Sequence, residues 1–449
     1  MTLNQPRRVL SLFDSTCLIV GIIIGAGIYQ MAPAIANGAG GPWAVLGLWF
    51  LGGVLSLCGA LCYAELATAY PKEGGDYVYL NRAYGSWAGF LFGWAQLTVV
   101  RPGDIAVMAF AFATYAAPVL DGLLVKWGIS LANGHKLYAA GAVAGLTWIN
   151  VAGVRAGAWA QNLLTILKAI GLLTVVGAAV AAGQAAMSET AAVRTEGLSW
   201  TLALIFVLFT YGGWNEMAYV AAEVRDPKRN ILRAMIWGMG AVTALYLLVN
   251  GAFLYALGYS GLAASEAVAV DVVRKVWPEQ AAWFVAALIC ISALGAVNGL
   301  ILTGARISYA VGSDYAWFRK LGRWDSRRDA PVTALLVQGA LAVGLILILG
   351  DFVKTVIYTA AVVYAFYLAT TLAVWVLRRK EPSRERPYRV WGYPVTPWLF
   401  ALVCAILMYS AVTYQPLLSA ASMGIILTGL PIWWWNRRRP ESAQSPGSV

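Results

Sequence analysis

The chain has 449 residues, of which 60% are hydrophobic and only 12% are charged, and its mean hydropathy is +0.68. Soluble domains carry about 25% charged residues, so this composition excludes a soluble protein and indicates one embedded in a membrane. The net charge of +11 raises the question of nucleic acid, but membrane topology explains it without such a partner. The first apolar stretch contains Asp14 and no small-residue cleavage site, so we interpret it as a retained helix.

Twelve segments are long and apolar enough to cross a bilayer, for which about 20 residues suffice. The segments do not show the ten-residue alternation of membrane strands. We therefore expect an all-α integral membrane protein with twelve transmembrane helices. The predicted spans are 12–37, 43–70, 87–118, 136–153, 158–183, 199–222, 232–258, 281–306, 331–350, 353–378, 397–414 and 417–436.

Basic residues fall mostly on one side of this arrangement. If the N-terminus is cytoplasmic, the cytoplasmic loops hold most of the 32 Lys and Arg residues, which is the expected bias. The longest of these loops is RRKEPSRERPYRVWGYP, residues 378–394, whose prolines prevent a continuous helix. We predict a protein of the plasma (inner) membrane with both termini inside, residues 1–11 forming a cytoplasmic N-terminus and residues 437–449 a cytoplasmic tail.

Two of the predicted helices contain glycines near their middle. The first includes GIIIGAGIYQ, residues 21–30, and the sixth includes FVLFTYGGWNEMAYV, residues 206–220. Glycine costs a helix interior about 1 kcal/mol relative to alanine, and lipid offers no water to freed backbone groups. Breaks in corresponding positions, five helices apart, are typical of inverted-repeat transporters that bind their substrate near the middle of the membrane.

Unwinding at these glycines would create backbone donors beside backbone acceptors. A break at residues 25–27 frees N–H groups for an anion, and the preceding carbonyls of Ile22 and Ile23 can accept bonds from a cation. A break at residues 211–213 adds carbonyl groups, with those of Phe209 and Gly212 well placed. Such a pair of sites matches a zwitterion such as an α-amino acid. The alternative is that the glycines allow close helix packing, but two corresponding breaks favour a binding site.

Five stretches in the first eight predicted helices resemble the amino acid–polyamine–organocation superfamily, most closely its L-type amino acid transporter branch. They keep their order along the chain and read GIIIGAGIY, YAELATAYPKEGGDYVYL, RPGDIAVMAFAFATY, FTYGGWNEMAYVAAEVRDPKRNILRA and LGAVNGLILTGARISYA. The resemblance implies the leucine-transporter (LeuT) type of fold, a 5+5 inverted repeat with discontinuous first and sixth helices. Residues 12–183 would form the first repeat, residues 199–378 the second, and residues 397–436 two trailing helices.

The resemblance also implies roles for residues at the two breaks. Ala26 and Gly27 would bind the substrate carboxylate, and Ile23, Phe209 and Gly212 would face its amino group. Phe209 would also act as an occluding gate. The expected substrate-binding residues are Ile23, Gly25, Ala26, Gly27, Phe209, Tyr211, Gly212, Gly213, Trp214 and Asn215.

The sequence departs from the family pattern at three places. Position 26 is Ala where the branch usually has Ser, so a hydroxyl donor is missing. Gly212 stands where some relatives that accept cationic substrates carry an acid, which weakens the case for lysine or arginine as substrate. The predicted outer loop 119–135 has no cysteine, whereas animal relatives link a glycoprotein subunit there, so we expect no disulfide-linked partner.

Several charged residues lie inside predicted helices, where a charge is costly and indicates function by default. The resemblance implies that Lys168 replaces the ion of sodium-coupled relatives and ties the first break to the eighth helix, with Ser292 as hydroxyl partner. Arg101 is expected to pair with Asp104 or another acid, and Glu65 with loop charges. Glu216 could face the substrate, although a face turned to another helix is the favoured interpretation.

The remaining chemistry-bearing residues predict no catalysis. The five cysteines lie in apolar segments and His135 lies in a polar loop, so we expect no metal, no cofactor and no enzyme activity. The leading hypothesis is a sodium-independent, alternating-access exchanger of α-amino acids, with neutral L-amino acids as the leading substrates. The alternatives are a proton-coupled or cationic amino acid or polyamine transporter and, in another class, a non-transporting amino-acid sensor.

Overall fold

The computed structural model describes residues 6–128, 131, 133–184, 200–349 and 352–437. Residues 1–5 of the predicted N-terminal segment and 438–449 of the predicted tail lie outside these described residues. In the first half of the chain, the helices are α1 (Leu12–Ile23), α2 (Gly27–Gln30), α3 (Ala32–Ala39), α4 (Pro42–Ala69), α5 (Asp76–Tyr84), α6 (Ser86–Ala95), η1 (Gln96–Val100), α7 (Arg101–Lys126), α8 (Gly134–Val151), α9 (Val154–Ala182), α10 (Trp200–Thr210) and η2 (Trp214–Glu223).

The second half is also helical. Its helices are α11 (Pro227–Ala264), α12 (Val268–Arg274), α13 (Ala281–Asp314), η3 (Ala316–Phe318), α14 (Val332–Leu349), α15 (Phe352–Lys380), α16 (Val395–Tyr414), α17 (Pro416–Leu427) and α18 (Gly429–Arg437).

All twelve predicted spans correspond to helices of the structure. Nine helical stretches of the described chain are long and apolar enough to cross a membrane. The other three predicted spans are α8, the short apolar helix α14, and the interrupted pair of α10 and η2. The protein is thus an all-α membrane protein, and its residues 381–394 are non-helical, as the prolines predict.

The structure corrects three details of the prediction. Helix α7 continues through Pro118 to Lys126 and α8 begins at Gly134, so most of the predicted outer loop 119–135 is helical. Helices α5 and α12 occupy segments that we expected to be loops. The second half of the sixth predicted helix, η2, is a tighter 3₁₀-helix rather than an α-helix.

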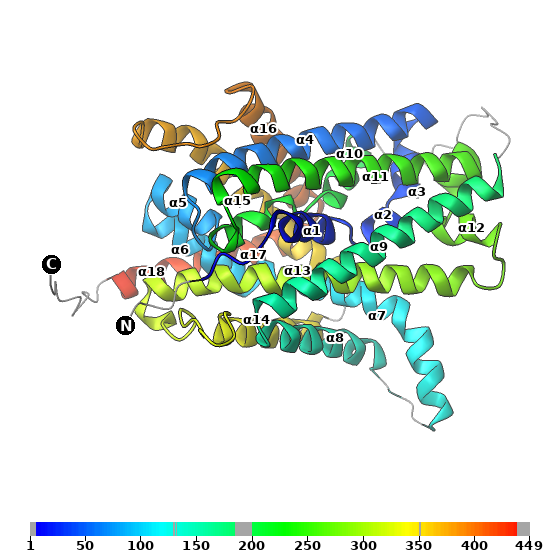
Figure 1. The fold of residues 1–449 in the computed structure, drawn as a ribbon, viewed down its shortest axis with the longest axis horizontal. Helices are drawn as coiled ribbons and strands as arrows, with labels where there is room; N and C mark the ends of the chain where they lie inside the picture. The colour runs from blue at the N-terminus through cyan, green and yellow to red at the C-terminus, as the bar shows by residue number, and fades with distance from the viewer. Residues whose placement is uncertain (1–5, 129–130, 132, 185–199, 350–351, 438–449) are drawn as a thin grey trace.

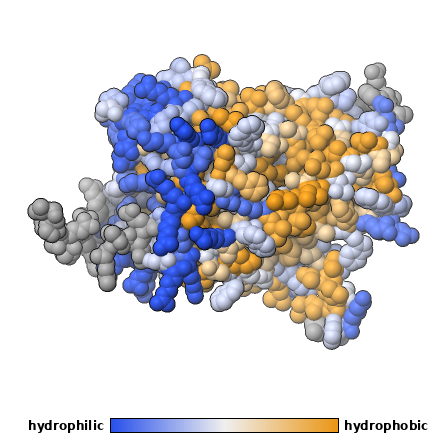
Figure 2. Space-filling model, viewed as in Figure 1, coloured by the Kyte–Doolittle hydropathy of each residue, from blue (hydrophilic) through white to orange (hydrophobic). Residues whose placement is uncertain are grey.

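Helix α1 lies at the centre of the molecule. It packs against α9, α11 and α13, which cross the whole bundle (Figure 1). The described residues that precede α1 and the last described helix, α18, lie at the same end of the bundle. Hydrophilic residues gather at that end on the face shown in Figure 2, and hydrophobic residues cover the middle of the bundle. The central position of α1 places its break inside the protein and away from lipid.

The two predicted breaks are present and lie against each other. Helix α1 stops at Ile23 and the chain resumes as α2 at Gly27, while α10 stops at Thr210 and η2 begins at Trp214. A Cβ atom at Gly27 would lie 2.8 Å from Thr210 Cγ2. Gly213 has φ of +108°, and a Cβ there would lie 2.6 Å from Ile22 Cγ2. Glycines at the breaks therefore serve both the unwinding and the close packing that we had treated as alternatives.

Candidate functional site

A cavity of about 170 Å³ opens beside the two breaks. One water needs at least about 10–15 Å³ of such space, so the cavity has room for a small organic molecule. Its walls come from the two interrupted helices and from α4, α7, α13, α15 and α16. The predicted site residues that line it are Ile23, Gly25, Gly27, Phe209, Gly212, Gly213 and Trp214.

Backbone groups at the first break supply both donors and acceptors. The amide of Gly25 bonds the carbonyl of Ile23 at 2.8 Å. In the described part of the chain the amides of Ala26 and Gly27 have no hydrogen-bond acceptor, as expected where a helix restarts. At the second break the Phe209 carbonyl accepts a bond from the amide of Gly212 at 3.1 Å and keeps a second lone pair.

Tyr246 of α11 connects the two breaks, a role that the sequence did not reveal. Its hydroxyl lies 3.1 Å from the carbonyl of Ile23 and 3.1 Å from that of Thr210. One hydroxyl proton serves one of these carbonyls at a time. The ring is fully buried and packs on Trp49 and Tyr211, with centroid distances of 5.2 and 5.1 Å. No sequence signal distinguishes this tyrosine from the other 21 of the 22 in the chain.

Three predicted site residues do not line the cavity. Ala26 is buried, and Tyr211 donates its hydroxyl to the carbonyl of Trp49 at 3.0 Å. Asn215 accepts a bond at 2.8 Å from Tyr367, which does line the cavity. The structure thus gives Tyr211 and Asn215 supporting positions, because helix rotation decides which side of a motif faces inward.

Lys168 of α9 is fully buried beside the first break. Its ammonium donates to the carbonyls of Gly21 at 2.7 Å, Ile24 at 2.8 Å and Ser292 at 3.1 Å, which uses all three of its donors. Two of these carbonyls belong to the end of α1, where the helix dipole is negative. The contact with α13 runs through the backbone of Ser292 rather than its hydroxyl, which lies 3.4 Å from the hydroxyl of Tyr29.

Arg101 and Glu216 form a buried ion pair. Arg101 Nη2 lies 2.9 Å from Glu216 Oε1, and the two side chains are 3% and 6% exposed. Thr303 of α13 donates to the second oxygen of Glu216 at 2.5 Å. Arg101 therefore pairs with Glu216 rather than with Asp104. Glu216 lines the cavity and also contacts a neighbouring helix, so both interpretations of this residue hold.

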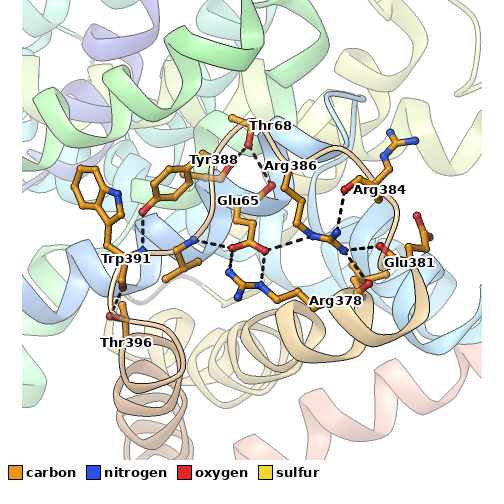
Figure 3. Close-up of polar contacts among 12 residues, drawn as sticks. Glu65, Thr68, Arg378, Glu381, Arg384, Arg386, Tyr388, Trp391 and Thr396 are labelled. Atoms are coloured by element: carbon orange, nitrogen blue, oxygen red, sulfur yellow. Dashed lines mark hydrogen bonds and ion pairs between the residues drawn. The ribbon is translucent and has the colours of Figure 1, made fainter.

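Glu65 fixes the segment after α15 to the end of α4. Arg378 reaches the Glu65 carboxylate with two bonds of 2.8 and 2.6 Å, and Arg386 lies 3.6 Å away. The amide of Val390 donates to the same carboxylate at 2.7 Å. Figure 3 shows Glu65 between the two arginines. The expectation that Glu65 pairs with loop charges is confirmed.

The sequence is similar to known transporters over most of its length. A profile of the amino acid permease family matches residues 10–435. The chain is 31% identical over 436 residues to large neutral amino acids transporter small subunit 2 of Rattus norvegicus, which covers 95% of this chain and 80% of the rat protein. It is 32% identical over 424 residues to b(0,+)-type amino acid transporter 1 of Homo sapiens, which covers 91% of this chain and 84% of the human protein. It is 31% identical over 442 residues to Asc-type amino acid transporter 1 of Mus musculus, covering 95% and 81%.

These matches span both interrupted helices and the cavity between them. The family and these relatives are transporters, not enzymes, and the arrangement of two broken helices around a central cavity fits the LeuT-type fold of the superfamily. The chain belongs to the amino acid permease family of the amino acid–polyamine–organocation superfamily, and is most similar to its L-type amino acid transporter branch.

Proposed function

We propose that this permease is a sodium-independent, alternating-access exchanger of α-amino acids, with neutral L-amino acids as its leading substrates. The observation that carries the proposal is the pair of facing backbone breaks beside one cavity. The free amide of Gly27, which lines the cavity, binds the carboxylate together with that of the preceding residue Ala26. The carbonyls of Ile23, Phe209 and Gly212 attract the ammonium group. The neutral class is supported by the rat relative, which is named for large neutral amino acids.

Sodium independence is supported by Lys168. The Lys168 ammonium, held by three carbonyls, takes the coordination that a sodium ion would need at this break. In the transport cycle, residues 12–183 and 199–378 act as the two repeats that move against each other, and Phe209 closes over the bound substrate.

We further propose that both termini are cytoplasmic, because basic residues gather in the loops on that side. The rat relative is named a small subunit. The segment between α7 and α8 has no cysteine, so this chain would transport without a subunit disulfide-linked there. A cationic substrate is the second candidate, because the carboxylates of Asp104 and Glu216 line the cavity.

Uptake of radiolabelled amino acids into liposomes that hold the purified protein tests this function. We expect uptake only into vesicles preloaded with unlabelled amino acid, at the same rate with sodium or choline outside. Uptake into empty vesicles driven by a proton gradient would contradict exchange and indicate a symporter. Binding without flux under every condition would indicate a sensor.

A further inference from the structure

A second and larger cavity lies at the hydrophilic end of the bundle. Its volume is about 620 Å³, against about 170 Å³ for the cavity beside the breaks. Its walls come from the segment before α1, the loop between α4 and α5, helix α5, and the last turns of η2 and α13. Helix α5 and the segment before α1 lie where hydrophilic residues gather (Figures 1 and 2), at the end that we propose to be cytoplasmic. Most of the lining side chains are polar or charged.

Helix η2 extends from one cavity to the other. Its first residue, Trp214, lines the cavity beside the breaks, and its ninth, Ala222, lines the second cavity. At about 2.0 Å per residue, the helix separates them by roughly 16 Å. Glu223, its last residue, forms a buried ion pair with Arg306 at 2.7 Å that holds the end of η2 against α13. A substrate that travels along η2 from this end therefore passes through the second cavity before it reaches the breaks.

Three charged side chains of the second cavity lack a partner of opposite charge. Among the described residues no carboxylate oxygen lies within ion-pair distance of Arg8 or Lys72, and no Lys or Arg nitrogen lies within that distance of Glu73. Burial raises the pKa of Glu73 above its usual value, and the nearby carboxylate of Glu223 raises it further. A cation that arrives beside Glu73 is therefore stabilised, while Arg8 and Lys72 can attract an anion.

The remaining charges of this cavity are already engaged. Arg82 pairs with Glu381 at 3.1 Å, and Asp314 accepts a hydrogen bond from the Tyr77 hydroxyl at 2.5 Å. The unpaired charges are thus two cations and one carboxylate, which match the two ends of a zwitterion better than an ion of one sign. They come from the segment before α1 and from the loop that joins α4 to α5.

We propose that the second cavity is a further binding site for the transported amino acid, which holds the substrate at the cytoplasmic end before this side opens. Arg8 and Lys72 attract its carboxylate, and Glu73 attracts its ammonium group. Because Arg8 and Lys72 are exposed, the site is weak and acts by raising the local concentration of substrate. This inference rests on the proposed function and names the side on which the substrate is first captured.

Exchange measured from each face of the membrane tests the proposal. Right-side-out and inverted membrane vesicles, preloaded with unlabelled amino acid, present the outer and the cytoplasmic face to the labelled substrate. Vesicles from cells without the protein give the background. In inverted vesicles we expect Glu73→Gln and Lys72→Gln to raise KM about fivefold, with the effect falling on KM rather than on kcat. In right-side-out vesicles both variants should show the wild-type KM, because the site at the breaks is not altered.

Glu385→Gln and Lys228→Gln are the matched controls, because these residues form an exposed pair and do not line the second cavity. Both should keep the wild-type KM at each face. A wild-type KM at the cytoplasmic face of the Lys72 and Glu73 variants, or an equal rise at both faces, would overturn the proposal. Absence of exchange by the wild type in both kinds of vesicle would instead overturn the proposed function.

Discussion

Lys168 connects three helices at the centre of the molecule. Its ammonium satisfies three carbonyls at once and joins α1, α9 and α13. The charge has no carboxylate partner among the described ion pairs, so carbonyl dipoles alone compensate its burial. This explains how a cation is tolerated at a depth where charges are rare.

Lys168→Met keeps the length of the side chain and removes its donors. Three buried carbonyls would lose their partner, each at about 1–3 kcal/mol, so we expect exchange to fall by at least about tenfold and the melting temperature in detergent to drop. Lys136→Met is the control, because the half-buried Lys136 donates to a single carbonyl, that of Leu347 at 2.8 Å. Wild-type exchange by Lys168→Met would show that the cation has no part in transport.

Tyr246 provides a second prediction at this scale. Tyr246→Phe removes the hydroxyl between the two breaks while its ring can keep its packing on Trp49. We expect a stability loss of only about 1 kcal/mol but a rise in KM, because the carbonyl of Ile23 loses the bond that positions it. Thermal melting and exchange kinetics separate the two effects. Tyr255→Phe, on an exposed part of the same helix, should change neither, and an unchanged KM in Tyr246→Phe would refute the positioning role.

Helices α1 and α9 are joined by a regular row of polar contacts. Asn162 donates to Asp14 at 2.6 Å, Thr165 to the carbonyl of Cys17 at 3.0 Å, and Lys168 continues the row one turn further. The donors are spaced three residues apart on α9, which places them on one face of that helix. The row holds α1 in place from Asp14 to its C-terminal end, so any opening that moves α1 from α9 must break it.

Thr165→Val removes one contact of this row with little change in shape. Losing this hydrogen bond should cost about 1 kcal/mol, which shifts the equilibrium for separating α1 from α9 roughly fivefold. We therefore expect Cys17 to react several-fold faster with a maleimide. The measurement uses a variant whose other four cysteines are replaced. Thr174→Val, on α9 where the Thr174 hydroxyl bonds only the Ile170 carbonyl of the same helix, should leave the rate unchanged. Equal rates in all three proteins would mean that the row does not control this opening.

The segment after α15 depends on Glu65. Removing one partner of a buried ion pair costs about 3–5 kcal/mol, and Glu65 is 1% exposed with Arg378 at 2.6 Å. We therefore expect Glu65→Gln to lower the melting temperature by several degrees. Glu385→Gln removes an exposed pair with Lys228 and should have little effect, since exposed pairs contribute about 0–1 kcal/mol. Equal melting temperatures for the two variants would contradict this account of the segment.

At the scale of the whole molecule, the orientation in the membrane is open to a direct test. We expect a cysteine introduced at Lys126, at the end of α7, to react with a membrane-impermeant maleimide on intact cells. A cysteine at Ser383, between α15 and α16, should react only after lysis. Both positions are exposed in the structure. The reverse pattern would contradict cytoplasmic termini.

Local sequence predicted the fold better than the site. Hydropathy located the spans, and glycines located both breaks, because these features depend on short segments. The extension of α7 was missed because Pro118 indicates a helix end, although a proline inside a long helix is tolerated here. The bridge made by Tyr246 and the position of Asp104 in the cavity depend on how helices rotate and pack, which a single sequence does not encode locally.

The most direct test of the central claim is whether recognition of the substrate needs both ends of a zwitterion. Leucine, threonine and lysine would each be tested as competitors of labelled exchange in proteoliposomes. The other competitors would be the amine that each of these amino acids leaves without its carboxylate, and the acid that it leaves without its α-amino group. If the two backbone breaks bind the head group, the amino acid that is transported inhibits the labelled exchange. Its amine and its acid should inhibit at least about tenfold more weakly. An amine or an acid that competes as well as its parent amino acid would contradict a head-group site built from the two breaks.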